Sequence, residues 1–489
     1  MPATGKKTES SDGGVRPGLT LAVVAVVQFM VSLDVSVVNV GLPRIAAGLG
    51  FGPAGLTWVI NAYALTFGGL LLLGGKAADR YGRKRVLLFG LTLFGLASLG
   101  GGLAQAPGQL VAARTVQGIG AAALAPAALS LLTATFPSGR ARVRALGVWS
   151  ATNAAGAAFG VVAGGLLTQY ASWRWVMLVN VPMAAGTLAL ARRGVVGSRP
   201  AERGSRPDVL GAVLATAGMT LLVFGVVRTD RHAWTSPVTV TTLACAVALL
   251  GAFVAVERTT AREPLVRLGL FTNRSVAGGN LYNLLIGAAM TPAFYFGSLY
   301  LQEVLGHGPA STGTMFLPVT LGLVAGSVLA VKLGYRFPAR LLLVAGGLLT
   351  AAGLAWFGRI SPAGSFTADF LGPSIVAGVG FGLCLGPVVS TATAAVAPHE
   401  AGTASGLLNS SRQIGASLGL AALGTAAAHR TGHRGSLVAL TDGYRLGLTL
   451  GAGLTLAAVV VALTVLRGPG ARVRLAQPEG DVDLVRAQD

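Results

Sequence analysis

The sequence predicts an all-α polytopic membrane protein in which two parallel six-helix halves and two inserted helices make 14 transmembrane helices. Three observations predict this class. Of the 489 residues, 53% are hydrophobic and only 11% are charged, whereas a soluble domain carries about 25% charged residues. The apolar residues gather in stretches of about 20 residues, enough to cross a hydrocarbon core about 30 Å thick. Glycines and prolines also recur at a nearly constant spacing across the chain.

Composition excludes several other classes of protein. The 71 glycines follow no collagen period and lie inside apolar runs. The two cysteines, Cys245 and Cys384, lie in separate apolar stretches, so they predict neither a disulfide framework nor a metal cluster. We expect no metal and no cofactor, because no nucleotide-binding motif or nucleophile triad is present. Transport would then use a proton gradient as its energy source.

The apolar stretches delimit the predicted organisation. An N-terminal tail covers residues 1–18 and a C-terminal tail covers 467–489, with a six-helix half at 19–193, two inserted helices at 208–257 and a second half at 275–466. The predicted spans are 19–41, 57–76, 86–105, 109–132, 143–168, 174–193, 208–228, 237–257, 275–300, 310–332, 339–357, 367–391, 402–428 and 443–466. The first is too long for a signal-peptide core, so we interpret it as a retained helix.

The basic residues fix the predicted orientation. Most of the 37 Lys and Arg residues lie in the tails and loops that are cytoplasmic if the N-terminus is inside. This asymmetry predicts that both termini are cytoplasmic. It also accounts for the net charge of +20 without a nucleic-acid partner.

An internal repeat supports the two-half arrangement. Gly118 and Gly120 resemble Gly378 and Gly380, and glycines and prolines of spans 4–5 recur about 260 residues later in spans 12–13. Eight helices separate the two members of each matched pair. Because successive spans alternate in direction, an even separation means that both members cross the membrane in the same direction. Parallel halves with a substrate site between them are one architecture of secondary transporters. Chance similarity between Gly-rich helices is the alternative explanation.

Intramembrane charges are the strongest functional signal. A charge at the bilayer centre costs at least about 2.5–3.5 kcal/mol, so such residues usually serve a function. Asp34 and Arg114 lie at similar predicted depths in spans 1 and 4, which favours an ion pair. Burial raises the pKa of a carboxyl and a nearby Arg lowers it. A carboxyl that alternates between such surroundings takes up and releases a proton; a static structural pair is the alternative.

The short loop between spans 2 and 3 predicts a gate. Gly75, Asp79, Arg80, Gly82 and Arg83 combine turn-forming glycines with one acid among bases. Asp79 can pair with an Arg or a helix N-terminus, and such a contact can break when the halves move. The alternative is a solvated basic loop that only sets topology.

Small residues predict close helix packing. Gly156, Gly160, Gly164 and Gly165 form a stripe at helical spacing on span 5, and Gly118 lies on span 4. Such stripes let helix backbones approach closely. We favour packing alone over a direct role in substrate binding.

Polar residues inside the spans are candidates for a substrate cavity. The set comprises Asn39, Asn61, Gln117, Asn283, Asn409 and Arg412. Hydrogen bonding between helices explains such residues equally well.

Several stretches resemble the fourteen-helix drug:proton antiporter branch of the major facilitator superfamily. They are residues 33–43 of span 1, Gly75–Arg85, Arg114–Gly120, Trp173–Trp175, Asn180–Pro182 and Ser405–Gln413. The resemblance covers nearly the whole chain and implies a major-facilitator fold. It also implies that Asp34 takes part in proton coupling and Arg114 in proton transfer.

Two positions depart from the pattern of that branch. Its span-5 motif reads Gly-Pro, where this chain has Gly160-Val161, and Ala77 replaces the usual Leu of loop 2–3. A proline would kink the helix. Its absence puts the direction and leak control of transport in question.

The resulting hypothesis is proton-coupled efflux of amphiphilic drugs or antibiotics across the bacterial cytoplasmic membrane. The expected partners are the small-molecule substrate, protons and the lipid bilayer, and we expect a monomer. Alternatives are a dedicated exporter or importer of one natural product on the same fold, and a non-transporting membrane sensor. A membrane enzyme would show a polar catalytic cluster, which the sequence lacks.

Overall fold

The computed structural model describes residues 17–136, 139–195, 208–230, 232–259, 264–393, 396, 401–432 and 436–466. All regular structure in these ranges is helical, and 13 of the helices are long and apolar enough to cross a membrane. The predicted tails lie outside the described residues, except that residues 17 and 18 already belong to the first helix.

Seven helices form the first six spans. They are α1 (Pro17–Leu49), α2 (Pro53–Tyr81), α3 (Arg83–Gly102), α4 (Pro107–Thr135), α5 (Gly139–Tyr170), α6 (Trp175–Leu178) and α7 (Asn180–Gly194). The inserted part contains α8 (Val209–Val227), η1 (Arg228–Asp230), α9 (Pro237–Thr259) and η2 (Leu268–Thr272). The remaining spans contain α10 (Arg274–Leu299), η3 (Tyr300–Val304), α11 (Pro309–Met315), α12 (Leu317–Gly334), α13 (Ala339–Phe357), η4 (Phe366–Leu371), α14 (Gly372–Thr393), α15 (Ala401–Thr431) and α16 (Leu437–Thr464).

Some helices extend beyond the predicted spans. α1 continues to Leu49, where the sequence predicted an end at 41, and α16 begins at Leu437 instead of 443. Ser436 caps α16 by accepting a hydrogen bond from the backbone N–H of Ala439. Hydropathy detects only the part of a helix that suits hydrocarbon, whereas backbone hydrogen bonding continues into the polar interface.

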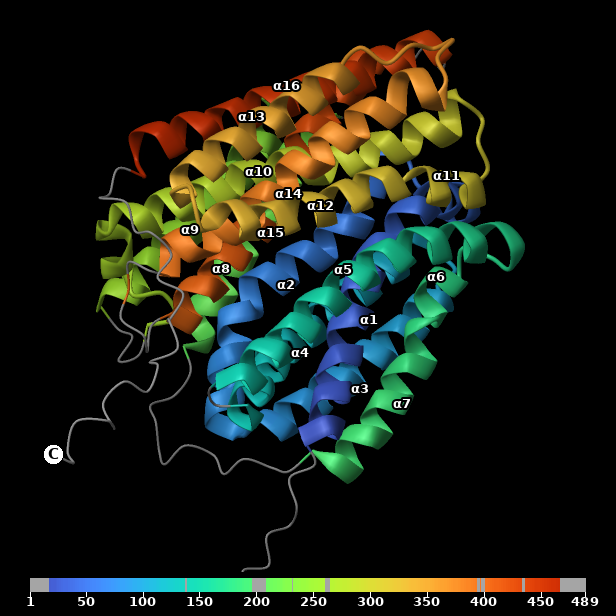
Figure 1. The fold of residues 1–489 in the computed structure, drawn as a ribbon. Helices are drawn as coiled ribbons and strands as arrows, with labels where there is room; N and C mark the ends of the chain where they lie inside the picture. Colours follow the sequence, from blue (N-terminus) through green and yellow to red (C-terminus); the bar gives the residue numbers. More distant parts are fainter. Residues whose placement is uncertain are drawn as a thin grey trace, which may run out of the picture.

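α15 forms the predicted thirteenth span but is not among the 13 helices that pass on length and apolarity. Its polar residues 409–413 interrupt the apolar run. The helix is shielded because it packs between α2, α10 and α16, so neighbouring helices surround it in place of lipid (Figure 1).

The two halves repeat the same packing. α5 lies along α1 as α15 lies along α10, and α4 lies between α2 and α3 as α14 lies between α12 and α13. A Cβ at Gly160 would lie 2.7 Å from the carbonyl oxygen of Leu33, and its repeat mate Gly419 contacts Ala288 in the same way. The predicted parallel repeat is therefore a repeat of backbone contacts.

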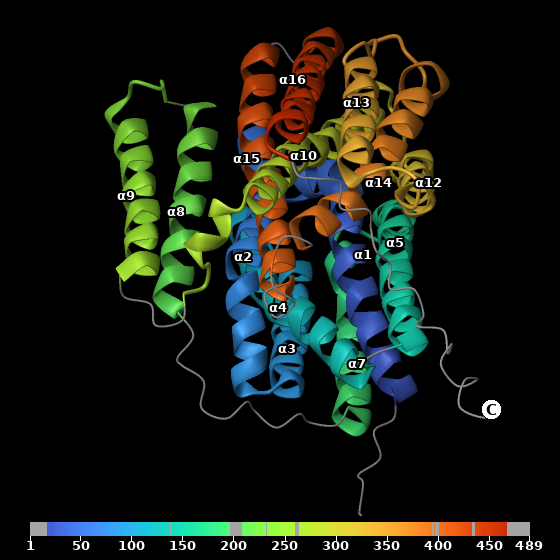
Figure 2. The same cartoon turned by 60° about the vertical axis from the view of Figure 1, so that its left-hand side comes forward.

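The inserted helices α8 and α9 form a hairpin on the outside of the bundle (Figure 2). α8 packs on α2 and also on α15. The pair therefore contacts one helix from each half.

We call the end of the bundle where α1 begins at Pro17 the tail end, and the end where α1 finishes at Leu49 the far end. Pro43 lies inside α1 and has no N–H to donate to the carbonyl of Asn39. That carbonyl accepts a hydrogen bond from Ser298 of α10 at 2.9 Å instead. Gln302 donates to the carbonyl of Val40 at 3.0 Å. A proline on α1 thus provides a link between the halves at the far end.

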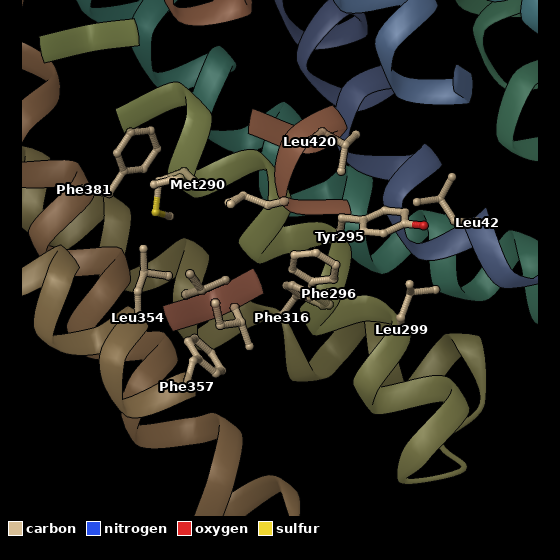
Figure 3. Packing of buried hydrophobic residues seen from close by; sticks show 14 of the residues in the cluster. Leu42, Met290, Tyr295, Phe296, Leu299, Phe316, Leu354, Phe357, Phe381 and Leu420 are labelled. Carbon is tan, nitrogen blue, oxygen red and sulfur yellow. The ribbon is translucent and has the colours of Figure 1, made fainter. Parts of the chain in front are cut away.

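Apolar side chains pack around this link. Figure 3 shows Tyr295 of α10 reaching toward Leu42 of α1, with Leu299 nearby. On α5, the Gln169 side chain accepts a hydrogen bond from the backbone N–H of Ala310 at 2.9 Å. The halves are therefore tied together at the far end by both α1–α10 and α5–α11 contacts.

The glycine contacts give a test of packing. Gly160→Ala places a methyl group against the α1 backbone and should lower the free energy of unfolding by about 1–3 kcal/mol. Gly147→Ala is a matched control on the same helix, because no atom lies within 4 Å of its Cβ position; helix propensity alone should stabilise it by up to about 1 kcal/mol. Thermal unfolding of the purified proteins measures both, and equal melting temperatures would contradict the packing argument.

Candidate functional site

Asp34 lies in the middle of α1 and is fully buried, at 0% exposure. The residues beside it in sequence include half-buried or exposed positions, such as Val35 at 41% exposure. The carboxyl group therefore points into the interior of the first half, among α3, α4 and α7, and not toward the outside of the bundle.

The carboxylate accepts three hydrogen bonds from two other helices. Nη1 of Arg114 donates to Oδ2 at 2.6 Å. Nε2 of Gln117 and Nδ2 of Asn180 each donate to Oδ1 at 2.9 Å. Gln117 also donates to Ser98 of α3 at 2.8 Å. Four helices thus supply a closed polar network around one acid.

The side chain of Arg114 is buried and makes several contacts besides its bond to Asp34. It is 2% exposed, its Nε donates to the backbone carbonyl of Val59 at 3.0 Å, and its Nη1 also donates to Oε1 of Gln117 at 2.8 Å. The guanidinium lies over the ring of Tyr63, 4.3 Å from its centroid. Cation–π contact and charge-assisted hydrogen bonds offset the loss of hydration.

The helix spacing explains this convergence. Arg114 and Gln117 are three residues apart on α4, so they lie on the same face one turn from each other. Gly118, next to them, lets α4 approach α2: a Cβ there would lie 2.6 Å from the carbonyl oxygen of Tyr63. The glycine therefore brings the arginine to the ring of Tyr63.

Some polar atoms near this network have no hydrogen-bond partner. They are the hydroxyl of Tyr63 and Oδ1 of Asn180, both buried. An unpartnered buried polar atom is costly. The network thus retains unused donor and acceptor capacity beside Asp34.

The loop between α2 and α3 is a tight turn at the tail end. Gly82 has a φ of 94°, a conformation that favours glycine, and it joins the two helices directly. Asp79 is exposed, and within the described chain it has no hydrogen bond or ion pair. The guanidinium of Arg80 lies 5.7 Å from the ring centroid of Tyr81. Gly75 faces Pro126 of α4, and Arg83 begins α3.

The glycines of α5 contact two different helices. Gly156, Gly160 and Gly164 abut the α1 backbone at Phe29, Leu33 and Val37, respectively. Gly165 abuts Pro309 and Ala310 of α11 in the other half. At the departure from the family pattern, Val161 is buried and α5 continues as an uninterrupted helix.

The predicted cavity residues separate into two groups. Gln117 belongs to the Asp34 network, and Asn61 of α2 is fully buried with both amide atoms unpartnered. Asn39 donates to the carbonyl of Val35 at 2.9 Å within α1. In the second half, Arg412 donates to Asn409 at 3.0 Å and Asn283 donates to the carbonyl of Leu408 at 2.6 Å.

The first half contains a polar cluster that the sequence analysis missed. Gln28 of α1 donates to Asn153 of α5 at 2.7 Å, and Ser32 also bonds Asn153. Phe29 and Leu284 make equivalent contacts with Gly156 and Gly415 in the two halves. By this alignment, Gln28 occupies the position equivalent to Asn283, and Asn153 occupies the position equivalent to Arg412. Polar residues therefore occupy matching α1–α5 and α10–α15 positions.

Asn180 and Ser98 were also missed as members of the Asp34 network. Asn180 belongs to the Asn180–Pro182 motif, which supported the family resemblance but did not indicate that Asn180 contacts Asp34. Ser98 lies in an apolar and glycine-rich stretch that gives no comparable signal.

Comparisons with known proteins agree with this architecture. A family model described as the Major Facilitator Superfamily matches residues 24–420. The cephamycin export protein CmcT of Amycolatopsis lactamdurans is 43% identical over 443 residues, covering 90% of each chain. The puromycin resistance protein pur8 of Streptomyces alboniger is 38% identical over 480 residues, covering 96% of this chain and 94% of that one.

Solved structures with low sequence identity share the fold. A bacterial homologue of the human lysosomal transporter Spinster, in an inward-facing and unoccupied conformation, has a TM-score of 0.64 at 17% identity and covers 92% of this chain and 97% of its own. A peptide transporter POT in complex with sulfate has a TM-score of 0.66 at 16% identity, with coverage of 91% and 93%.

The Asp34–Arg114 pair gives a second prediction. Arg114→Gln leaves the carboxylate buried without its counter-charge and should lower the free energy of unfolding by about 3–5 kcal/mol. Adding Asp34→Asn should recover most of that loss. Thermal unfolding of the two single variants and the double variant measures the coupling.

The half-exposed pair Asp442–Arg445, at 3.2 Å and 37% side-chain exposure, supplies the control. Asp442→Asn should change stability by only about 0–1 kcal/mol, because water screens such pairs. Additive losses in the Asp34/Arg114 cycle would mean that the two residues do not depend on each other.

Proposed function

Because the chain belongs to the major facilitator superfamily, we propose that this multi-pass membrane transporter exports amphiphilic drugs or antibiotics in exchange for protons. Its relatives include antibiotic export and resistance proteins. The observation that carries proton coupling is the buried carboxylate of Asp34, held at 2.6 Å by Arg114 within a network of four helices. No cofactor is needed for such an exchange, and we propose no enzymatic activity.

Protonation would change this network at one atom. A proton on Oδ2 of Asp34 would neutralise the carboxylate and remove the charge that holds Nη1 of Arg114. Arg114 would keep its bonds to the Val59 carbonyl and Gln117 and its contact with Tyr63. The arginine therefore has a second stable set of partners that does not include Asp34.

α1 would transmit the loss of this ion pair to the contacts between the two halves at the far end. The same helix carries Asp34 and the carbonyls of Asn39 and Val40. These carbonyls bind Ser298 of α10 and Gln302 of η3. A rotation or shift of α1 after loss of the ion pair would strain these far-end links. Opening of the far end would follow from protonation because both contacts belong to one rigid helix.

The charge distribution supports an orientation for this cycle. We propose that both termini and the tail end face the cytoplasm of a bacterial cell, because the tail-end loops carry most of the basic residues. The linked far end would then be the closed external gate. Asp79 is exposed and unpaired in the described chain. In this arrangement the predicted contact of Asp79 with an Arg or a helix N-terminus is broken, so the cytoplasmic gate is open.

Substrate would bind between the halves. The matched polar residues, Gln28 and Asn153 on one side and Asn283 and Arg412 on the other, lie among apolar helix surfaces. Scattered polar groups in an apolar surround suit an amphiphilic small molecule.

We propose a monomer in the lipid bilayer without a nucleic-acid partner. A dedicated exporter of one natural product is the second candidate, because a relative at 43% identity carries the name of a single exported antibiotic class.

Asp34→Asn should lower proton-driven efflux of a fluorescent substrate at least about tenfold, because the amide cannot take up and release a proton as a carboxyl group does. The measurement is dye efflux from cells and inverted vesicles, with and without an uncoupler. Expression should stay close to wild type, since an amide fits the same volume and Arg114 keeps its bonds to the Val59 carbonyl and Gln117. The melting temperature should fall, because Arg114 loses its counter-charge. Asp442→Asn is the matched control. Undiminished, uncoupler-sensitive efflux in Asp34→Asn would rule out the proposed role.

Removing the far-end links should favour the externally open state. Ser298→Ala combined with Gln302→Leu deletes both hydrogen bonds to the α1 carbonyls, each of which contributes about 0.5–1.5 kcal/mol. The two bonds together are worth about 1–3 kcal/mol, so an impermeant thiol reagent should label a cysteine placed at Tyr295 at least about fivefold faster. Thr449→Ala on α16 provides a control outside this contact. An unchanged labelling rate would show that these bonds do not hold the far end closed.

A further inference from the structure

The second half contains a cation that no described acid balances. Arg412 of α15 is half-buried and donates one hydrogen bond, from Nη2 to Oδ1 of Asn409 at 3.0 Å. Asn409 is a neutral residue on the same helix. Among the residues that the structure describes, Arg412 has no carboxylate partner and no aromatic ring against its guanidinium group. Most N–H donors of this guanidinium group are therefore available to another molecule.

The other deep cation shows what such a group needs inside a membrane protein. Arg114 binds the carboxylate of Asp34 and the carbonyl of Val59 and lies over the ring of Tyr63. A charge at membrane depth is costly, so it is normally paired within the protein. Arg412 receives only one neutral acceptor. The described chain by itself thus leaves most of this charge uncompensated.

The internal repeat shows that this charge is specific to the second half. The position equivalent to Arg412 in the first half is Asn153, a neutral residue that accepts a hydrogen bond from Ser32. In the same alignment, Gly287 of α10 occupies the position of Ser32. A Cβ at Gly287 would lie 3.2 Å from Cγ of Arg412. The absence of a side chain at Gly287 therefore leaves space for the longer arginine.

The position of Arg412 on its helix directs it between the two halves. Gly415 lies against the backbone of Leu284 on α10, and Gln413 lies against Gly68 of α2. Because successive residues of an α-helix are rotated by about 100°, position 412 lies between these two contact faces. It therefore faces the space that α10 of the second half and α2 of the first half enclose.

The same face of α15 reaches the closed contact at the far end. Leu420 lies eight residues beyond Arg412 and belongs to the apolar cluster that contains Leu42 of α1 and Tyr295 of α10 (Figure 3). Eight residues of helix span about 12 Å, so Arg412 lies on the tail side of this cluster. Asp34 lies eight residues before Leu42 on α1 and is therefore at a similar depth.

A guanidinium group with free donors suits a particular class of ligand. It recognises planar anionic oxygen groups, carboxylates above all, through paired N–H···O bonds. We propose that Arg412 binds an anionic oxygen group of the exported molecule, with Asn409 holding the guanidinium group in place. The assignment rests on the export function proposed above and names the substrate class as amphiphilic acids. The apolar residues toward Leu420 suit the remainder of such a molecule.

Equilibrium binding without any ion gradient tests this assignment. The probes are pyrenebutyrate and its methyl ester, which share an apolar body and differ in the carboxylate. With the full-length protein in phosphatidylcholine nanodiscs, and with binding to empty nanodiscs subtracted, wild type should bind the acid at least about tenfold more tightly than the ester. Arg412→Met should remove this preference. Arg430→Gln, which deletes a charge from an exposed position of the same helix, should keep it.

Two further measurements separate ligand binding from a structural role. Arg412→Lys keeps the positive charge but loses the planar fork, so it should retain a preference for the acid of about threefold or more. Without ligand, the melting temperature of Arg412→Met should not fall below that of wild type, because the substitution leaves no counter-charge unpaired. An arginine that only stabilised the fold would lower it.

Three results would overturn the proposal. Equal affinity of wild type for the acid and the ester would mean that the cavity has no anion site. Equal weakening of both probes in Arg412→Met would mean that the arginine only shapes the cavity. A phosphatidylglycerol molecule that remains bound to wild type, but not to Arg412→Met, in native mass spectrometry would assign Arg412 to a lipid headgroup.

These binding measurements are independent of proton coupling, because they use no gradient and leave Asp34 intact. Failure of the acid to bind would refute the anion site and leave the proposed proton exchange untouched. Undiminished efflux in Asp34→Asn would refute the proposed proton exchange and leave the binding result untouched.

Discussion

The structure of the first half depends on placing one carboxylate inside a membrane protein. Asp34 is fully buried, so its charge must be matched within the protein. Arg114, Gln117 and Asn180 supply that match, and they come from α4 and α7. The helices cannot separate without exposing an unpaired charge to hydrocarbon. The same condition makes the network sensitive to a proton, because neutralising one oxygen removes the reason for the arrangement.

Close backbone contact makes this network possible. Gly118 brings α4 against α2, and Gly160 brings α5 against α1, at distances that a side chain would prevent. The second half repeats the contact between α5 and α1, because Gly415 and Gly419 of α15 lie against the backbone of α10. The glycines have a packing role in each half, whereas the charges do not repeat: the position that matches Asn153 in the first half is Arg412 in the second. The halves thus share a scaffold but differ in chemistry.

The connections between the halves use groups that helix formation leaves free. Pro43 releases the carbonyl of Asn39, which then binds Ser298 across the interface. Such a bond is modest in free energy and breaks without disturbing either half. The inserted hairpin adds a contact of another kind, because its helix α8 packs on α2 of the first half and on α15 of the second. Weak links at the far end suit a protein whose halves move relative to each other.

The sequence alone determined the membrane class, the succession of apolar helices and the repeat, because apolar length and glycine spacing are local properties of the chain. It also predicted the Asp34–Arg114 pair, since two opposite charges at similar depth have few other partners in hydrocarbon. Only the tertiary structure decided that Asn180 and Ser98 join that pair, that Gln117 faces Asp34, and that Gln28 meets Asn153. Neutral polar residues tolerate many partners at little cost, so their contacts depend on how helices distant in sequence rotate against each other.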